Sequence, residues 1–150
     1  MRASSVLFVT SSGGHWVQAS KLLAAVFDYE VDIATVDETA VSGINYRRFY
    51  KIPDFNRDTP LKMILGIPAI VHCVLSSDAT HVISTGAAPG LLALACARMV
   101  GKRTMWIDSI ANTEKLSVSG RIAKVIAHKT LTQWENVAEV TDVSYEGRLL

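Results

Sequence analysis

The stretch Val6-Leu-Phe-Val-Thr-Ser-Ser-Gly-Gly-His15 decides how the rest of the sequence is interpreted. An apolar, β-branched run breaks into Ser11-Ser12-Gly13-Gly14, and a segment with helical spacing follows at once. That order predicts a strand, a tight glycine turn and a helix, whose free N–H groups and positive dipole end favour an anionic ligand. The stretch is neither the G-x-G-x-x-G fingerprint nor a P-loop, which would carry a lysine. From the turn alone, a ligand loop and an ordinary strand-to-helix turn that serves tight packing both stay open.

Strand-like and helix-like segments alternate along the whole chain. Short apolar runs predict strands at residues 5–9, 30–35, 48–52, 80–84, 103–107 and 129–132, with a short seventh at 143–146. Helical spacing predicts a first helix through Trp16, Ala19, Ser20, Leu23, Val26 and Phe27, and further helices at 61–76, 89–100 and 119–128. This alternation predicts an α/β fold, a single Rossmann-like domain over residues 1–150 with a mostly parallel sheet.

Composition limits the classes of function. With 49% hydrophobic residues, 19% charged residues and a net charge of +1, we expect a globular protein whose main partner is not nucleic acid. Cys73 and Cys96 lie in apolar segments without metal-ligand spacing, so we expect reduced core thiols, no metal and no cofactor. The N-terminus carries no signal-peptide pattern, and no run reaches the roughly 18 apolar residues of a membrane span. We therefore expect a cytoplasmic protein.

Parallel α/β sheets bind ligands beyond the carboxyl ends of their strands. Two glycine turns that meet at such an edge suit a phosphorylated ligand. His15 starts a helix, where neutral imidazole is favoured, and so fits a proton acceptor. Asp108 ends a strand and fits either a general base or the cap of a turn. The other residues expected to line this crevice are Ser12, Gly13, Gly14, Gly86, Gly90, Ser109, Asn112 and Gln133.

The predicted helix at 61–76 is apolar nearly all round. Two interpretations stay open: a deeply buried helix, or an apolar face offered to a membrane surface or a partner. Arg121, Lys124 and His128 recur at helical spacing further along the chain, with Lys129 beside them. Such a basic stripe is either simply solvated or adds affinity for anionic lipid.

Four segments together resemble one family in order and spacing: SSGGH at residues 11–15, VISTGAAPG at 82–90, WIDSIANTEKLSVSGRIAKVIAHKTLTQW at 106–134, and YEGRLL at 145–150. The family is the acceptor-side subunit of two-part, GT-B-type glycosyltransferases. It includes the subunit that anchors the UDP-N-acetylglucosamine transferase of dolichol-linked oligosaccharide assembly, and bacterial counterparts in capsule and exopolysaccharide synthesis. The chain is similar, more distantly, to the N-terminal half of the lipid II-forming N-acetylglucosamine transferase. The bacterial branch fits better, because the eukaryotic anchor has an N-terminal transmembrane helix and no such segment is expected in this sequence.

The resemblance implies an inverting transfer from a UDP-sugar to a polyprenyl-diphosphate-linked sugar. It implies a second GT-B half that holds the UDP-sugar, peripheral contact with the inner face of the cytoplasmic membrane, and no metal. A complete GT-B enzyme needs two domains, about 300 residues, of which this chain is expected to supply one. His15 is the implied base or a contact to the acceptor diphosphate. Asp108 is its rival as the base, although the family often has Glu at that place.

Two other functions compete with this one. The first is a non-catalytic docking subunit that recruits and stabilises its catalytic partner at the membrane. The second is a free-standing nucleotide-binding domain, for which Asp37 would supply the ribose-binding acid although the glycine fingerprint is missing.

Overall fold

The computed structural model describes residues 4–26 and 28–150, and in them seven strands form one parallel sheet. The order across the sheet is β3-β2-β1-β4-β5-β6-β7. The chain moves outward from β1 to β3 and then returns to β4, so the winding direction reverses between β1 and β4. Ligands bind beside such a reversal in open α/β sheets. The strands are β1 (Ser5–Val9), β2 (Glu30–Thr35), β3 (Arg48–Lys51), β4 (His81–Ser84), β5 (Arg103–Ile107), β6 (Lys129–Thr132) and β7 (Ser144–Tyr145).

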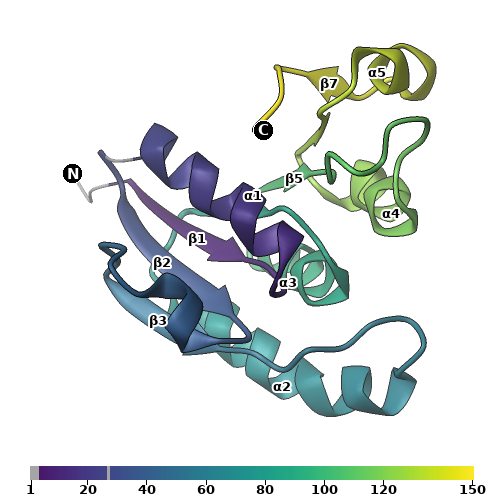
Figure 1. The fold of residues 1–150 in the computed structure, drawn as a ribbon. Coiled ribbons are helices and arrows are strands. Elements are labelled where there is room, and N and C mark those ends of the chain that lie inside the picture. The colour runs from purple at the N-terminus through teal and green to yellow at the C-terminus, as the bar shows by residue number, and fades with distance from the viewer. Residues whose placement is uncertain (1–3, 27) are drawn as a thin grey trace.

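Helices connect the strands and cover both faces of the sheet (Figure 1). Within the described residues these are α1 (Gly14–Leu22), α2 (Pro60–Ser76), α3 (Ala88–Met99), α4 (Val118–Ile126) and α5 (Glu135–Thr141), with 3₁₀ turns η1 (Leu23–Val26) and η2 (Glu38–Val41). One core cluster joins the sheet to α2, α3 and α4, and the other joins it to α1 and η2. The predicted α/β fold is therefore confirmed, as is the parallel sheet.

The structure corrects the predicted elements in three places. The strands predicted at 5–9, 30–35, 103–107 and 129–132 have the predicted bounds, whereas the other predicted strands and the helices predicted at 61–76, 89–100 and 119–128 shift by one or two residues at an end, where local signals are weak. Helix α5 was not predicted. Helix α4 ends at Ile126, so His128 lies beyond it and does not share a helical face with Arg121 and Lys124. Phe27, placed on the first helix by its spacing, lies outside the described residues.

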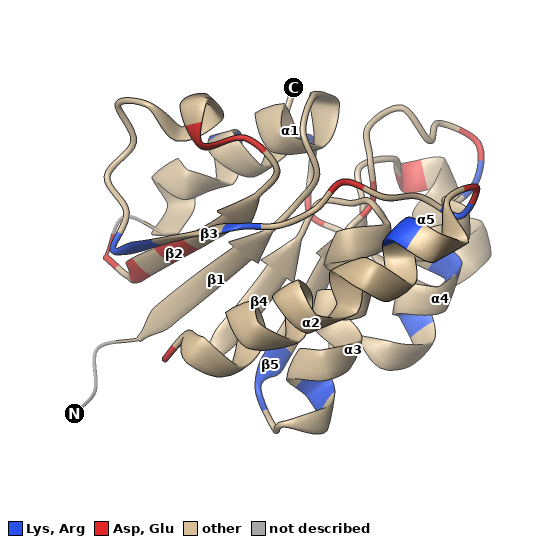
Figure 2. Ribbon diagram, turned by 90° about the horizontal axis from the view of Figure 1, so that it is seen from below, with Lys and Arg blue, Asp and Glu red and all other residues tan. Residues whose placement is uncertain are grey.

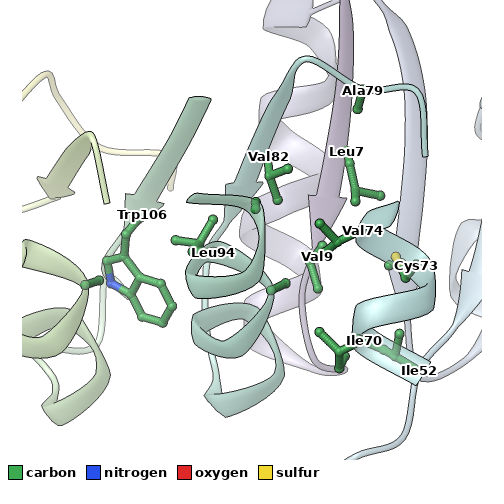
Figure 3. Packing of buried hydrophobic residues seen from close by; sticks show 14 of the residues in the cluster. Leu7, Val9, Ile52, Ile70, Cys73, Val74, Ala79, Val82, Leu94 and Trp106 are labelled. Carbon is green, nitrogen blue, oxygen red and sulfur yellow. The ribbon is translucent and has the colours of Figure 1, made fainter. Parts of the chain in front are cut away.

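The larger core lies between the sheet and helices α2 to α4 (Figure 3). Leu7 and Val82 project from neighbouring strands, while Val74 and Leu94 meet them from α2 and α3. Trp106 on β5 is 1% exposed and extends this core toward α4. Because strands covered on both faces need apolar side chains on both, runs such as Ser5–Val9 are buried at every position.

An ion pair inside the fold holds β2 in place. Asp32 is fully buried and accepts hydrogen bonds from Arg47 Nε and Nη2, each at 2.8 Å, and from Ser77 Oγ at 2.6 Å. Burial alone would raise the pKa of Asp32, but these hydrogen bonds and the nearby arginine charges outweigh it and hold the pKa below its usual value. Asp32 thus fastens the start of β3 and the end of α2 to β2, the strand next to the edge of the sheet.

Helix α2 is buried in one half and exposed in the other. Its second half supplies Ile70 and Val74 to the core, whereas Leu61, Ile64 and Leu65 in its first half are largely exposed. Lys62 is its one charged residue, and the ribbon coloured by charge is nearly uniform along α2 (Figure 2). No helix in residues 4–26 and 28–150 is long and apolar enough to cross a bilayer.

Candidate functional site

Three of the predicted loops meet at the carboxyl ends of β1, β4 and β5. They enclose a cavity of about 100 Å³. His15 and Gly86 line it from the loops after β1 and β4, and Asp108, Ser109 and Asn112 line it from the loop after β5. Residues as much as 97 positions apart in the sequence are thus brought together, as the rule for parallel sheets predicts.

The imidazole of His15 is held in one tautomer. Its Nδ1 lies 2.9 Å from the carbonyl oxygen of Thr85. Because a carbonyl oxygen only accepts, Nδ1 carries the hydrogen, and Nε2 of the neutral ring keeps its lone pair. Thr85 Oγ1 donates to the carbonyl of His15 at 2.6 Å, and the Thr10 hydroxyl lies 3.1 Å from Thr85 Oγ1. Both the ring and the backbone of His15 are therefore tied to the end of β4.

The second glycine turn is shaped around protein groups. A Cβ on Gly86 would lie 2.4 Å from His15 Nδ1, and the φ of Gly86 is +126°, which side chains other than hydrogen rarely tolerate. A Cβ on Gly90 would lie 1.8 Å from Ser84 Oγ. The missing side chain of Gly86 therefore makes room for the imidazole of His15, and the missing side chain of Gly90 lets α3 approach β4.

The first glycine turn is open. Ser12, Gly13 and Gly14 are exposed, and a Cβ on either glycine would meet no atom within 4 Å. Gly13 is the N-cap of α1, and no side chain in the described part of the chain caps this helix. The first N–H groups of α1 therefore point outward at the positive end of the helix dipole, an arrangement that favours an anion.

Asp108 is occupied by hydrogen bonds from the protein. It is 1% exposed, and its Oδ1 accepts from Trp106 Nε1 at 3.0 Å and from Ser117 Oγ at 2.6 Å. Its Oδ2 accepts from Asn112 Nδ2 at 3.1 Å and from Ser117 N at 2.9 Å. A carboxylate has about four acceptor positions, and all are used here. This geometry fits the cap of the 109–117 loop better than it fits a base.

Two buried amide side chains, one on α1 and one after β6, hydrogen-bond to each other. Gln18 on α1 and Gln133 after β6 are 2% and 1% exposed, and Gln133 Nε2 donates to Gln18 Oε1 at 2.5 Å. Gln133 was predicted to contact the substrate, and Gly90 likewise. Both are buried against protein groups, so the proposed ligand site does not include them.

Sequence reasoning missed two residues that shape the site, Ser117 and Gln18, whereas the rule for strand ends had already placed Thr85 in the crevice, in the loop after the fourth strand. Ser117 had a usable signal, because a serine directly before a helical segment is a typical N-cap, and its Oγ accepts from Gly120 N at 2.8 Å. Gln18 had none, since its partner Ser109 lies far away in the sequence. Within the described chain, no cluster of three or more His, Cys, Asp or Glu side chains is placed to hold a metal ion.

Comparisons with known proteins relate the fold to GT-B-type proteins. No family model matches the chain, and no curated protein matches it in sequence. The crystal structure of MurG from Acinetobacter baumannii superposes with a TM-score of 0.72 at 12% identity, over 89% of this chain and 43% of that one. A putative UDP-N-acetylglucosamine 2-epimerase from Listeria monocytogenes gives 0.66 at 10% identity, over 91% and 41%.

The chain therefore has the fold of one half of a GT-B-type protein. It spans about two fifths of the length of these structures. A UDP-glucose 4-epimerase from Brucella ovis, solved with NAD, is also similar, with a TM-score of 0.54 at 12% identity. Because one fold serves transferases and epimerases alike, the chemistry of this chain has to be argued from its own site.

Proposed function

We propose that this chain is the acceptor-side half of a split, inverting glycosyltransferase. It passes a sugar from a UDP-sugar to a polyprenyl-diphosphate-linked acceptor in polysaccharide biosynthesis, and is active only with a second GT-B half that holds the UDP-sugar. The observation that carries the proposal is His15: its Nδ1 is committed to Thr85, and its ring lines a cavity directly beside the open, uncapped start of α1.

The chemistry follows from these positions. Nε2 of His15 takes the proton of the acceptor hydroxyl while that oxygen attacks the anomeric carbon and the bond to the UDP oxygen breaks. The acceptor diphosphate lies against the exposed N–H groups of Gly13 and Gly14, where the dipole of α1 favours its charge. Asp108 keeps the 109–117 loop in place, and Ser109 and Asn112 contact the acceptor sugar.

The size of the cavity supports a site shared between two halves. Small-molecule pockets usually measure about 300–1,000 Å³, whereas this cavity measures about 100 Å³. The chain alone therefore offers one wall of a cleft and little enclosed space. A second half-domain facing the carboxyl ends of β1, β4 and β5 completes the cleft in this proposal.

The same proposal places the protein on the inner face of the cytoplasmic membrane. The support is the exposed apolar side chains Leu61, Ile64 and Leu65 at the start of α2. Arg121 on α4 is exposed and free to approach anionic lipid, while Lys124 donates to the carbonyl of Thr141. A basic residue adds about 1 kcal/mol at such a surface, so the apolar side chains of α2 carry most of the binding.

A ligand titration of the purified chain tests the proposal without the partner. Farnesyl diphosphate supplies a prenyl chain and a diphosphate, and it should shift the backbone amide signals of Gly13, Gly14 and His15 in NMR spectra. UDP also carries a diphosphate, but it should bind more weakly, because in this proposal the second half holds the nucleotide. Tighter binding of UDP than of farnesyl diphosphate would favour the free-standing nucleotide-binding domain, and binding of neither would favour the docking subunit.

A further inference from the structure

Gln18 hydrogen-bonds to two segments that supply lining residues of the cavity, the turn before His15 and the loop after Asp108. It lies on α1 one turn after Gly14, and its Nε2 donates to the carbonyl of Gly14 and to Ser109 Oγ, each at 3.2 Å. Its Oε1 accepts from the backbone N–H of Ile110 at 3.0 Å. The first contact is to the turn that carries His15, and the other two are to the loop that follows Asp108.

Gln133 adds further hydrogen bonds to this arrangement. Its Nε2 donates to Gln18 Oε1 at 2.5 Å and to the carbonyl of Asp108 at 3.0 Å, and its Oε1 accepts from Leu149 N at 2.9 Å. The Gln18 amide thus uses both hydrogens and two acceptor positions. Its orientation is fixed, because the Ile110 N–H must meet an oxygen and the Gly14 carbonyl must meet a nitrogen.

A buried polar pair is a costly way to fill space. Apolar side chains of the same volume would pack between α1 and β6 without any desolvation of amides. What apolar side chains would not provide is a fixed separation between two backbone segments. Hydrogen bonds set that separation to within tenths of an ångström, whereas apolar contacts allow it to slide.

We propose that Gln18 is a positioning residue for sugar transfer. It holds the turn that bears His15 at a set distance from residues 108–110, so that the base and the acceptor-binding loop face each other across the cavity. Gln133 is the second residue of the pair and acts through its hydrogen bond to Gln18. The inference rests on the proposed function, since it assigns Gln18 to the same site.

Two variants separate positioning from simple stability. Gln18→Met keeps the volume, removes all four hydrogen bonds of the amide and leaves Gln133 Nε2 without one of its acceptors. The double variant Gln18→Met with Gln133→Met removes both members of the pair, which recovers part of the lost stability. Ser20→Ala is the matched control on the same helix, because within the described residues its hydroxyl bonds only to Val17 O in α1.

Transfer by the assembled two-subunit enzyme is the first measurement. An error of about 1 Å in the placement of reacting groups costs about a hundredfold in rate, so we expect kcat to fall ten- to a hundredfold in Gln18→Met. The KM for the UDP-sugar should stay unchanged. The double variant should regain melting temperature but not kcat, and Ser20→Ala should behave as wild type. Recovery of kcat together with melting temperature, or a wild-type kcat in Gln18→Met, would overturn the inference.

Hydrogen exchange of the chain alone is the second measurement. The amide of Ile110 should exchange faster in Gln18→Met than in wild type, and an unchanged rate would contradict the contact on which the inference rests. The two proposals fail in different ways. If the wild-type complex transfers no sugar, the proposed function is refuted. If the Gln18→Met complex transfers sugar as fast as the wild-type complex, only the role of Gln18 is refuted.

Discussion

The two glycine turns of this protein look alike in sequence and differ in what they make room for. At Gly13 and Gly14 an added Cβ would meet nothing within 4 Å, so these glycines leave backbone exposed to solvent. At Gly86 and Gly90 an added Cβ would lie 2.4 Å from His15 and 1.8 Å from Ser84. The first turn is open toward a ligand, and the second is filled by the protein itself.

This difference changes how a glycine near a binding site should be interpreted. Both turns follow strands whose carboxyl ends face the same crevice, and from sequence both were assigned to the ligand. In the structure the second turn serves the ligand only indirectly, because Gly86 seats the imidazole of His15 and Thr85 orients it. Four substitutions test this contrast, in order of expected effect.

The largest effect on the transfer rate is expected at His15, which directly follows the first turn and whose imidazole packs against the second turn. Replacement by Ala should lower the transfer rate of the assembled enzyme by about 10²–10⁴-fold, the usual contribution of a general base. The free energy of unfolding should change little, because His15 is only partly buried. Asp108→Asn is the comparison: it disturbs four hydrogen bonds and should reduce stability more than His15→Ala does. Near wild-type turnover in His15→Ala would move the base elsewhere.

Gly86→Ala comes next. At φ +126° a non-glycine residue costs about 1–3 kcal/mol from the backbone alone, and the new Cβ also displaces the imidazole. We expect a marked loss of the free energy of unfolding, measured by urea denaturation. In a His15→Ala background the collision is gone and only the backbone strain remains, so the same substitution should cost less. An equal loss of the free energy of unfolding in the two backgrounds would mean that Gly86 does not make room for the His15 imidazole.

Gly90→Ala tests the other filled glycine. Overpacking of a buried site costs about 1–3 kcal/mol, and here the new methyl meets Ser84 Oγ. The double variant with Ser84→Ala should be less destabilised than the sum of the two single variants. Strict additivity would show that Gly90 and Ser84 do not oppose each other in solution.

The sequence predicts the parts of this molecule that depend on neighbouring residues. Strands such as Arg103–Ile107 and the turn before α1 carry their signals within ten residues. Helix α5 was missed because it has seven residues and begins after Trp134, which offers no capping side chain. A short helix without a cap has little local signal to detect.

The candidate site divides in the same way. The rule for parallel sheets placed His15, Gly86, Asp108, Ser109 and Asn112 around one cavity without knowledge of any contact. The rule does not predict whether the carboxylate of Asp108 is free or hydrogen-bonded by the protein, and it does not predict which amide side chains are buried. The role of Asp108 depends on donors up to nine residues away, and that of Gln18 on partners 91, 92 and 115 residues away. Such contacts exist only after the chain has folded.

Gly14→Ala has the smallest expected effect on stability and separates the two turns most clearly. A methyl group at the first helical position meets no atom within 4 Å, and Ala is the better helix former, so the free energy of unfolding should change by less than about 0.5 kcal/mol. The methyl group would, however, stand beside the exposed N–H groups of α1. Loss of one hydrogen bond to a charged phosphate is worth about 1.5 kcal/mol, so farnesyl diphosphate should bind about tenfold more weakly. Ser20→Ala, whose hydroxyl bonds to Val17 O within the same helix, is the control for binding. If Gly14→Ala binds farnesyl diphosphate as wild type does, the first turn is open for a reason other than a diphosphate.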